Sequence, residues 1–200
     1  MKPSRRVLVA ALAAFSLVWC LAAAPAVLAR PRAPVVAPPS AAPRTLILVR
    51  HAEKASDDPR DPSLSDLGRE RAQALAQLLA RSGAKRLIAS EFKRTRETLA
   101  PLAGALALEV ESVPARDLDA LAKLVTDSPP GAVLVVAGHS NTLPALAAKL
   151  GAPLANVPAG AQGPALDDAE YDRLFVLTLP SADAATAPSV LELAYGRASP

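Results

Sequence analysis

The chain contains two histidines, and each follows a short apolar segment that is typical of a buried strand. Arg50 and His51 come directly after residues 45–49, and His139 comes just after residues 132–137. Strands that are buried on both faces belong to α/β sheets, in which ligands bind beyond the carboxyl ends of the strands. We therefore expect both histidines to lie at one binding crevice.

The residue types at these positions are suited to phosphoryl chemistry. A neutral imidazole can attack phosphorus and form a phosphohistidine that water hydrolyses, and we predict this role for His51. The transferred group spreads negative charge over its oxygens, so cations and hydrogen-bond donors must surround it. Arg50 and Arg94 can supply guanidinium groups, and His139 can donate a hydrogen bond. Asn141 marks the start of the next predicted helix, where backbone N–H groups point toward an anion.

Other interpretations of the same residues remain open. A single histidine after a strand can be structural, and Arg94 can lie on a solvated helix face. A two-histidine metal site is the functional alternative, but it needs carboxylate ligands and would place Arg50 beside a cation. The convergence of two histidines and an arginine on the ends of three predicted strands favours a site for a phosphate ester.

Four segments, in this order, resemble the histidine phosphatase superfamily, the phosphoglycerate-mutase-like proteins. They are Arg50-His51, Leu64-Ser65-x-x-Gly68, Ser90-x-x-x-Arg94-Thr95-x-x-Thr98 and Gly138-His139-Ser140-Asn141. The resemblance implies an α/β/α sandwich and a phosphohistidine intermediate on His51. It also implies a phosphate pocket formed by Arg50, Arg94 and His139, and no metal or organic cofactor.

Two departures from the family pattern bear on the reaction. Ala52 stands where the family usually has glycine, which is a small change. The segment rich in Asn, Trp, Arg and Phe that is typical of the glycolytic mutases is replaced by Glu53-Lys54 and an acidic loop. This favours a phosphatase acting on a phosphomonoester or phosphoanhydride. The alternatives are a phosphotransfer mutase and a non-catalytic phosphate-binding or regulatory protein of the same fold.

The predicted reaction also uses a general acid, for which the sequence offers several candidates. The family often places Glu or Asp between the second arginine and the second histidine, where it protonates the leaving oxygen. Asp117 is the first candidate, followed by Asp119 and Glu53, and some members have no obvious acid. Both aspartates begin a predicted helix, so they can equally serve the helix dipole. The predicted catalytic residues are thus His51, His139 and Asp117.

The elements that position these residues alternate between strand and helix. Ser65 is a predicted N-cap, and Ala72, Leu75, Ala76 and Leu79 then follow the spacing of one helical face that ends near Gly83. This order predicts an α/β domain, a three-layer α/β/α sandwich with a mostly parallel central sheet. Further strands are predicted at 85–89, 108–113, 173–179 and 189–194, the last two at a sheet edge. Further helices are predicted at 92–107 (interrupted or bent near Pro101), 117–126 and 142–150, and a loop at 152–169.

The N-terminal segment has the pattern of a secretory signal. Basic residues at positions 2, 5 and 6 precede the apolar residues 7–21, and cleavage is predicted after Ala29. The alternative is an uncleaved membrane anchor formed by residues 7–28. Residues 30–44 form a Pro/Ala-rich linker, and residues 45–200 the predicted domain. The pattern predicts export, to the periplasm or outside the cell, unless the anchor remains.

Composition limits the partners. The chain has 22 Lys and Arg against 19 Asp and Glu, and three of the basic residues lie in the predicted leader, so the remainder has no net charge. A basic surface for nucleic acid is therefore not predicted. Cys20, the only cysteine, lies in the leader, which excludes disulfides and cysteine metal sites from the mature chain. The expected partner is a small phosphorylated substrate, with membrane contact only through the leader.

Overall fold

The computed structural model describes residues 42–160, 163–181 and 183–199. The predicted signal peptide and nearly all of the predicted linker lie outside these residues, so export and anchoring stay predictions. Within the described residues, no helix combines the length and the apolar character needed to cross a membrane.

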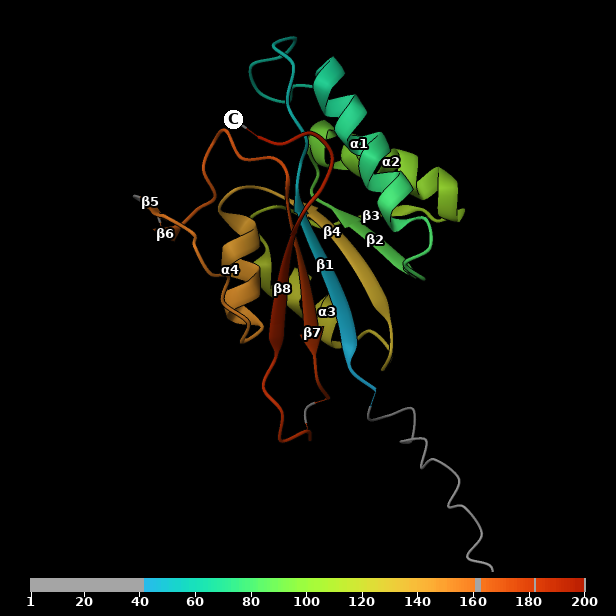
Figure 1. The fold of residues 1–200 in the computed structure, drawn as a ribbon, viewed down its shortest axis with the longest axis vertical. Helices are drawn as coiled ribbons and strands as arrows, with labels where there is room; N and C mark the ends of the chain where they lie inside the picture. The colour runs from blue at the N-terminus through green and yellow to red at the C-terminus, as the bar shows by residue number, and fades with distance from the viewer. Residues whose placement is uncertain (1–41, 161–162, 182, 200) are drawn as a thin grey trace, which may run out of the picture. The chain divides into compact units, whose positions relative to one another are not determined.

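A six-stranded mixed sheet forms the centre of the domain (Figure 1). Its strand order is β3-β2-β4-β1-β7-β8. The first four strands in this order are parallel to one another. β7 pairs antiparallel with β1, and β8 pairs antiparallel with β7. The bounds are β1 Arg44–Arg50, β2 Arg86–Ala89, β3 Val110–Ser112, β4 Val133–Gly138, β7 Arg173–Leu179 and β8 Ser189–Ala194.

The register of β1 against β4 brings the two histidines to the same place. Arg50 is paired with Gly138, the last residue of β4, so His51 and His139 leave the sheet side by side. The backbone N–H of His51 continues this pairing and donates to the Gly138 carbonyl at 2.9 Å. The carboxyl ends of both strands therefore open at one edge of the sheet, as the sequence predicts.

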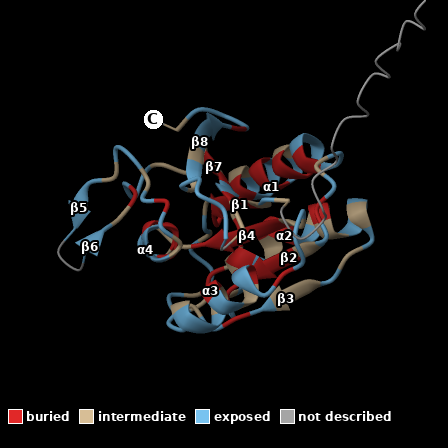
Figure 2. Cartoon of the chain, turned by 90° about the horizontal axis from the view of Figure 1, so that it is seen from below, coloured by how far each residue is buried: buried red, intermediate tan, exposed pale blue. Residues whose placement is uncertain are grey.

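Two helices cover each face of the sheet, which confirms the predicted three-layer α/β/α arrangement (Figures 1 and 2). One face packs against α1 (Asp66–Leu79) and α2 (Lys93–Leu106), and the other packs against α3 (Leu118–Thr126) and α4 (Thr142–Lys149). The hairpin formed by β5 (Ala159–Gly160) and β6 (Gly163–Pro164) is the remaining described element.

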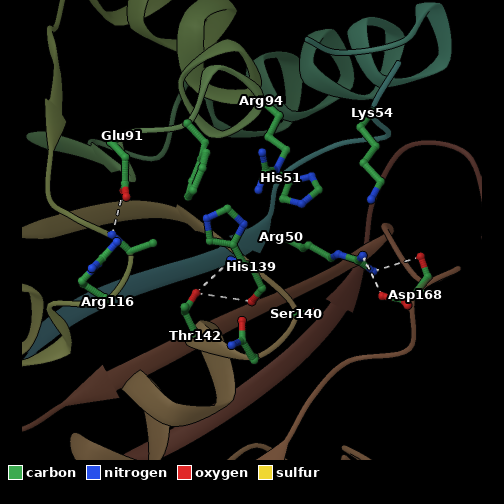
Figure 3. A pocket seen from close by; sticks show the side chains of 13 residues that line it. Arg50, His51, Lys54, Glu91, Arg94, Arg116, His139, Ser140, Thr142 and Asp168 are labelled. Atoms are coloured by element: carbon green, nitrogen blue, oxygen red, sulfur yellow. Dashed lines mark hydrogen bonds and ion pairs between the residues drawn. The ribbon is translucent and has the colours of Figure 1, made fainter. Parts of the chain in front are cut away.

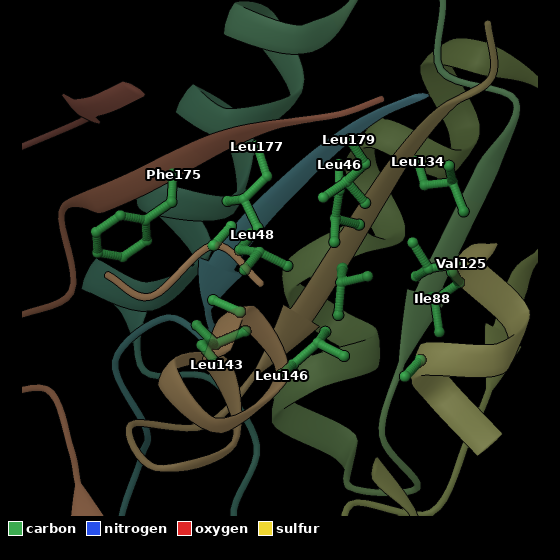
Figure 4. Close-up of a cluster of buried hydrophobic side chains, with 14 of the residues drawn as sticks. Leu46, Leu48, Ile88, Val125, Leu134, Leu143, Leu146, Phe175, Leu177 and Leu179 are labelled. Carbon is green, nitrogen blue, oxygen red and sulfur yellow. The ribbon is translucent and has the colours of Figure 1, made fainter. Parts of the chain in front are cut away.

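The alternation of side chains along β1 divides the core into two clusters. Leu46 and Leu48 point to the α3 and α4 side, together with Phe175 of β7 (Figure 4). Ile47 and Val49 point to the α1 and α2 side. All of these side chains are at most 5% exposed, as expected for strands covered on both faces.

Several boundaries differ from the sequence-based expectation. The last two strands form one edge of the sheet, as expected, with β8 outermost and β7 between β1 and β8. The helix α2 continues through Pro101 without interruption. The helix α1 ends at Leu79, and Gly83 lies in the turn beyond it with a φ of 72°. The short β5–β6 hairpin lies within the segment predicted as loop.

Candidate active site

A pocket of about 480 Å³ opens at the carboxyl ends of β1 and β4 (Figure 3). Five of the six predicted site residues line it, and Asp117 does not. The lining consists of Arg50, His51, Lys54, Glu91, Phe92, Arg94, Ala115, Arg116, His139, Ser140, Asn141, Thr142 and Asp168. Side chains that are far apart in the sequence therefore surround one cavity.

His51 is buried and held in one tautomer. Its ring Nδ1 lies 2.8 Å from the carbonyl oxygen of Ala52. A carbonyl can only accept, so Nδ1 carries the proton and Nε2 keeps its lone pair. The pKa of His51 is lowered to about 3, mainly by burial; the nearby His139, Arg50 and Arg94 contribute to the lowering, and the Ala52 hydrogen bond opposes it. His51 is therefore neutral at physiological pH, as a nucleophile must be.

His139 is positioned by a chain of hydrogen bonds behind the pocket. The Thr95 hydroxyl donates to the Phe92 carbonyl at 2.8 Å, and the Ser90 and Thr95 hydroxyls are 2.8 Å apart. Ser90 therefore donates to Thr95 and can accept the Nε2–H of His139 at 3.0 Å. The ring of Phe92 packs edge-on against His139 at 5.3 Å, and the two imidazole centroids are also 5.3 Å apart.

Burial also lowers the pKa of His139 to about 4, and Arg94 adds to this effect while Glu91 opposes it. Both imidazoles are thus uncharged in the free protein.

The two lowered pKa values predict a loss of stability in mild acid. Between pH 6.5 and about 4, the unfolded chain binds protons at both histidines that the folded chain does not bind. Stability therefore falls as the pH falls through this window. We expect the free energy of unfolding at pH 5 to be lower than at pH 7 by about 2 kcal/mol for each histidine, measured by urea denaturation.

A double variant, His51→Gln with His139→Gln, is the control for this prediction. It should lose most of the change in stability between pH 7 and pH 5, because carboxylates with ordinary pKa values hardly titrate there. An unchanged pH dependence in the double variant would contradict the assignment of neutral, buried imidazoles.

Arg50 has a structural role in addition to the predicted one. Its Nη1 donates to the carbonyl oxygens of Asp167, Asp168 and Glu170 at 2.6, 3.2 and 2.9 Å. Its guanidinium also lies 4.2 Å from the centroid of the Tyr171 ring. The Nε of Arg50 is buried and has no hydrogen-bond partner within the described residues. One edge of the guanidinium is therefore committed to the segment 167–170, and Nε is left as an unused donor.

The charge around the pocket is positive. Arg94, in the first turn of α2, lies against the ring of Phe92 at 4.3 Å and 3.8 Å from an oxygen of Asp61. Lys54 and Arg116 line opposite sides of the mouth (Figure 3). Four cationic side chains thus face two carboxylates, and the neutral histidines add nothing. This balance favours an anion of about two charges.

The segment Leu64-Ser65-x-x-Gly68 supports the loop that follows His51. The Glu53 carbonyl accepts hydrogen bonds from the backbone N–H and the hydroxyl of Ser65. Ser65 is the N-cap of α1 and accepts from the Gly68 N–H, which confirms the predicted cap. A Cβ at Gly68 would come within 2.2 Å of the Glu53 carbonyl oxygen. Only glycine therefore fits there without movement of the loop.

The three predicted general-acid candidates all lie outside the pocket lining, and each carboxylate has another partner. Asp117 caps α3 by accepting from the Ala120 N–H at 2.9 Å. Asp119 forms a 2.5 Å ion pair with Lys149. Glu53 accepts two-pronged hydrogen bonds from Arg71. The geometry gives no support to these residues as proton donors. The pocket carboxylates are instead Glu91 and Asp168, which the sequence interpretation did not single out.

Across the described ranges, no group of three or more His, Cys, Asp or Glu side chains is arranged to hold a metal ion. The two histidines are accompanied in the pocket by Arg50 and Arg94, whose charge opposes a cation.

Comparisons with known proteins agree with this fold. Residues 46–115 match the model of the histidine phosphatase superfamily (branch 1). The putative phosphohistidine phosphatase SixA from Nakamurella multipartitia has a similar structure, with 26% identity, a TM-score of 0.54, and coverage of 78% of this chain and 99% of that one. The match and the shared fold support membership of the chain in branch 1 of the histidine phosphatase superfamily.

Two further solved structures share the fold. The protein histidine phosphatase SixA, complexed with tungstate, has 19% identity and a TM-score of 0.56, and the match covers 75% of this chain and 96% of that one. Mycobacterial glucosyl-3-phosphoglycerate phosphatase, with inorganic phosphate, has 18% identity and a TM-score of 0.54 over 78% of this chain and 98% of that one. Among curated proteins, none matches the chain significantly.

Proposed function

We propose that this protein is a phosphatase that hydrolyses a phosphomonoester or phosphoanhydride through a phosphohistidine intermediate on His51. The observation that carries the proposal is the state of His51. Its Nδ1–H is committed to the Ala52 carbonyl, its Nε2 has a free lone pair, and it is neutral in a pocket of net positive charge. These are the requirements for nucleophilic attack on an anionic phosphoryl group.

In the proposed first step, His51 Nε2 attacks phosphorus, and the bond to the leaving oxygen breaks with its electron pair. Arg50 and Arg94 neutralise the charge that develops on the phosphoryl oxygens. The buried Nε–H of Arg50 has no protein acceptor in the described structure, and a phosphoryl oxygen would satisfy it. Water then attacks the phosphohistidine, inorganic phosphate leaves, and the electron pair of the P–N bond returns to His51.

His139 has a complementary role in this proposal. It is neutral in the free protein, and its Nε2–H is directed toward Ser90. A bound phosphoryl dianion raises the pKa of a neighbouring imidazole, because the opposite charge favours the protonated form. Substrate binding thus gives the ring a second N–H and a positive charge, both of which stabilise the transferred group.

The similar structures support a phosphorylated substrate. They are a protein histidine phosphatase complexed with tungstate and a glucosyl-3-phosphoglycerate phosphatase with inorganic phosphate, and both bound species are oxyanions. Their substrates differ, so the shared fold supports the reaction class and leaves the substrate of this chain open.

Trapping of the intermediate tests the proposal. Brief exposure of the protein to a ³²P-labelled phosphoester followed by denaturation should leave label that is acid-labile and base-stable, on the peptide that contains His51. Stoichiometric release of free phosphate distinguishes hydrolysis from a mutase. Turnover with label absent from His51 would contradict the mechanism, and the absence of turnover on a broad panel of phosphoesters would favour a binding protein.

A further inference from the structure

The pocket contains two carboxylates, and they are held differently. The side chain of Asp168 is fully exposed, and its Oδ1 lies 3.5 Å from Nη2 of Arg50. Glu91 is positioned through only one oxygen, because Oε2 accepts a hydrogen bond from the backbone N–H of Ala115 at 2.7 Å. This bond holds the carboxylate against the loop between β3 and α3 and commits only Oε2 (Figure 3).

The position of Glu91 in the chain places it among the groups of the site. It follows Ser90, which contacts His139, and it precedes Phe92 and Arg94. Its negative charge acts on both sides of the pocket, since it opposes the lowering of the pKa of His139 and of Arg94 by burial. Glu91 lines the same pocket as His51, Arg94 and His139, where a phosphoester would bind in the proposed reaction.

We propose that Glu91 is the general acid of this site, which protonates the leaving oxygen and then activates the water. The inference rests on the proposed function, because it assigns a residue to that same reaction. Lysine and arginine are poor proton donors for this step near neutral pH. Asp168 is already the ion-pair partner of Arg50, since its Oδ1 lies 3.5 Å from Nη2 of that guanidinium. Glu91 is the pocket carboxylate with no ion-pair partner within the described residues.

The proton balance closes over the two steps. When His51 Nε2 displaces the ester oxygen, that oxygen takes the proton of the Glu91 carboxylic acid and leaves as an alcohol. In the second step, the Glu91 carboxylate takes a proton from the attacking water as its oxygen bonds to phosphorus. The P–N bond breaks, phosphate departs, and Glu91 is protonated again for the next turnover.

The test uses a series of aryl phosphates of similar size, from 2,4-dinitrophenyl phosphate to unsubstituted phenyl phosphate. A good leaving group departs without a proton, whereas phenolate needs one. We expect Glu91→Gln to lower kcat/KM for phenyl phosphate by about 10²-fold and to change that for 2,4-dinitrophenyl phosphate far less. The amide oxygen of glutamine can still accept the Ala115 N–H, so the loop is retained.

Asp168→Asn is the matched control and should lower both rates by similar factors, with no change in their ratio. Equal losses on both substrates in Glu91→Gln would overturn the role of Glu91 and leave the phosphohistidine mechanism intact. The proposed function fails separately, if the unaltered protein turns over neither substrate or if His51→Ala retains the turnover of 2,4-dinitrophenyl phosphate.

Discussion

Replacement of His51 by alanine is expected to lower phosphatase turnover by about 10⁴-fold or more, because it removes the atom that forms the covalent intermediate. Phosphate binding should change little, since the guanidinium groups of Arg50 and Arg94 remain in the pocket. Steady-state kinetics give the first quantity, and calorimetric titration with inorganic phosphate gives the second. Loss of turnover together with retained binding would separate catalysis from affinity.

The second histidine provides the control. His139→Ala removes a group that stabilises the phosphoryl oxygens, so we expect a loss of about 10²–10³-fold in kcat. The labelled intermediate on His51 should still form, more slowly. Equal losses in the two variants, with no label in either, would contradict distinct roles for the two imidazoles.

Replacement of Arg71 by methionine is expected to destabilise the protein by about 3–5 kcal/mol, because it leaves a charge buried without its partner. The Arg71 side chain is 2% exposed, and its Nε and Nη2 donate to the Glu53 carboxylate, which is 15% exposed. Its Nη1 donates to the Tyr195 carbonyl at 3.0 Å. One side chain thus joins the loop after His51 to the C-terminal segment. Denaturant unfolding measures the loss.

A double-mutant cycle distinguishes the unpaired charge from simple loss of packing. The variant Glu53→Leu with Arg71→Met removes both charges, so it should recover a large part of the stability that Arg71→Met alone loses. Arg81→Met, at an exposed position, should lie within about 0.5 kcal/mol of the unaltered protein. Additive effects in the cycle would show that Glu53 and Arg71 are not coupled.

Strong local patterns account for what could be predicted of the fold. The apolar segment 45–49 lies within β1, the segment 132–137 overlaps all but the last residue of β4, and Ser65 caps α1, because each depends on residues close in the sequence. The last pair of strands forms a sheet edge as predicted, but which strand is outermost was not predicted. Alternation along residues 173–179 indicates a strand, but it does not specify neighbours, and β7 is interior because β8 follows it.

The site was predictable to the extent that its residues end strands. His51, His139 and Arg94 lie where strand ends or helix starts place them. The contacts of Arg50 with the carbonyls of Asp167 and Glu170 could not be predicted, since every residue has a backbone carbonyl and its type does not show which one accepts. Glu91 was not predicted as a site residue, because a single carboxylate next to a motif forms no repeating pattern that would distinguish it from a surface residue. The Ser90-to-Thr98 segment was the available signal, since its residues Glu91, Phe92 and Arg94 all line the pocket.

The central place of β1 determines when the pocket can be completed during synthesis. This strand is made first, yet it pairs with β4 on one side and β7 on the other, both of which emerge from the ribosome much later. Until Arg173–Leu179 has been translated, Leu46 and Leu48 lack part of their apolar covering. The segment 167–170, whose carbonyls accept hydrogen bonds from Arg50, is also made late. Nascent chains that stop before β7 should therefore be prone to aggregation and dependent on chaperones.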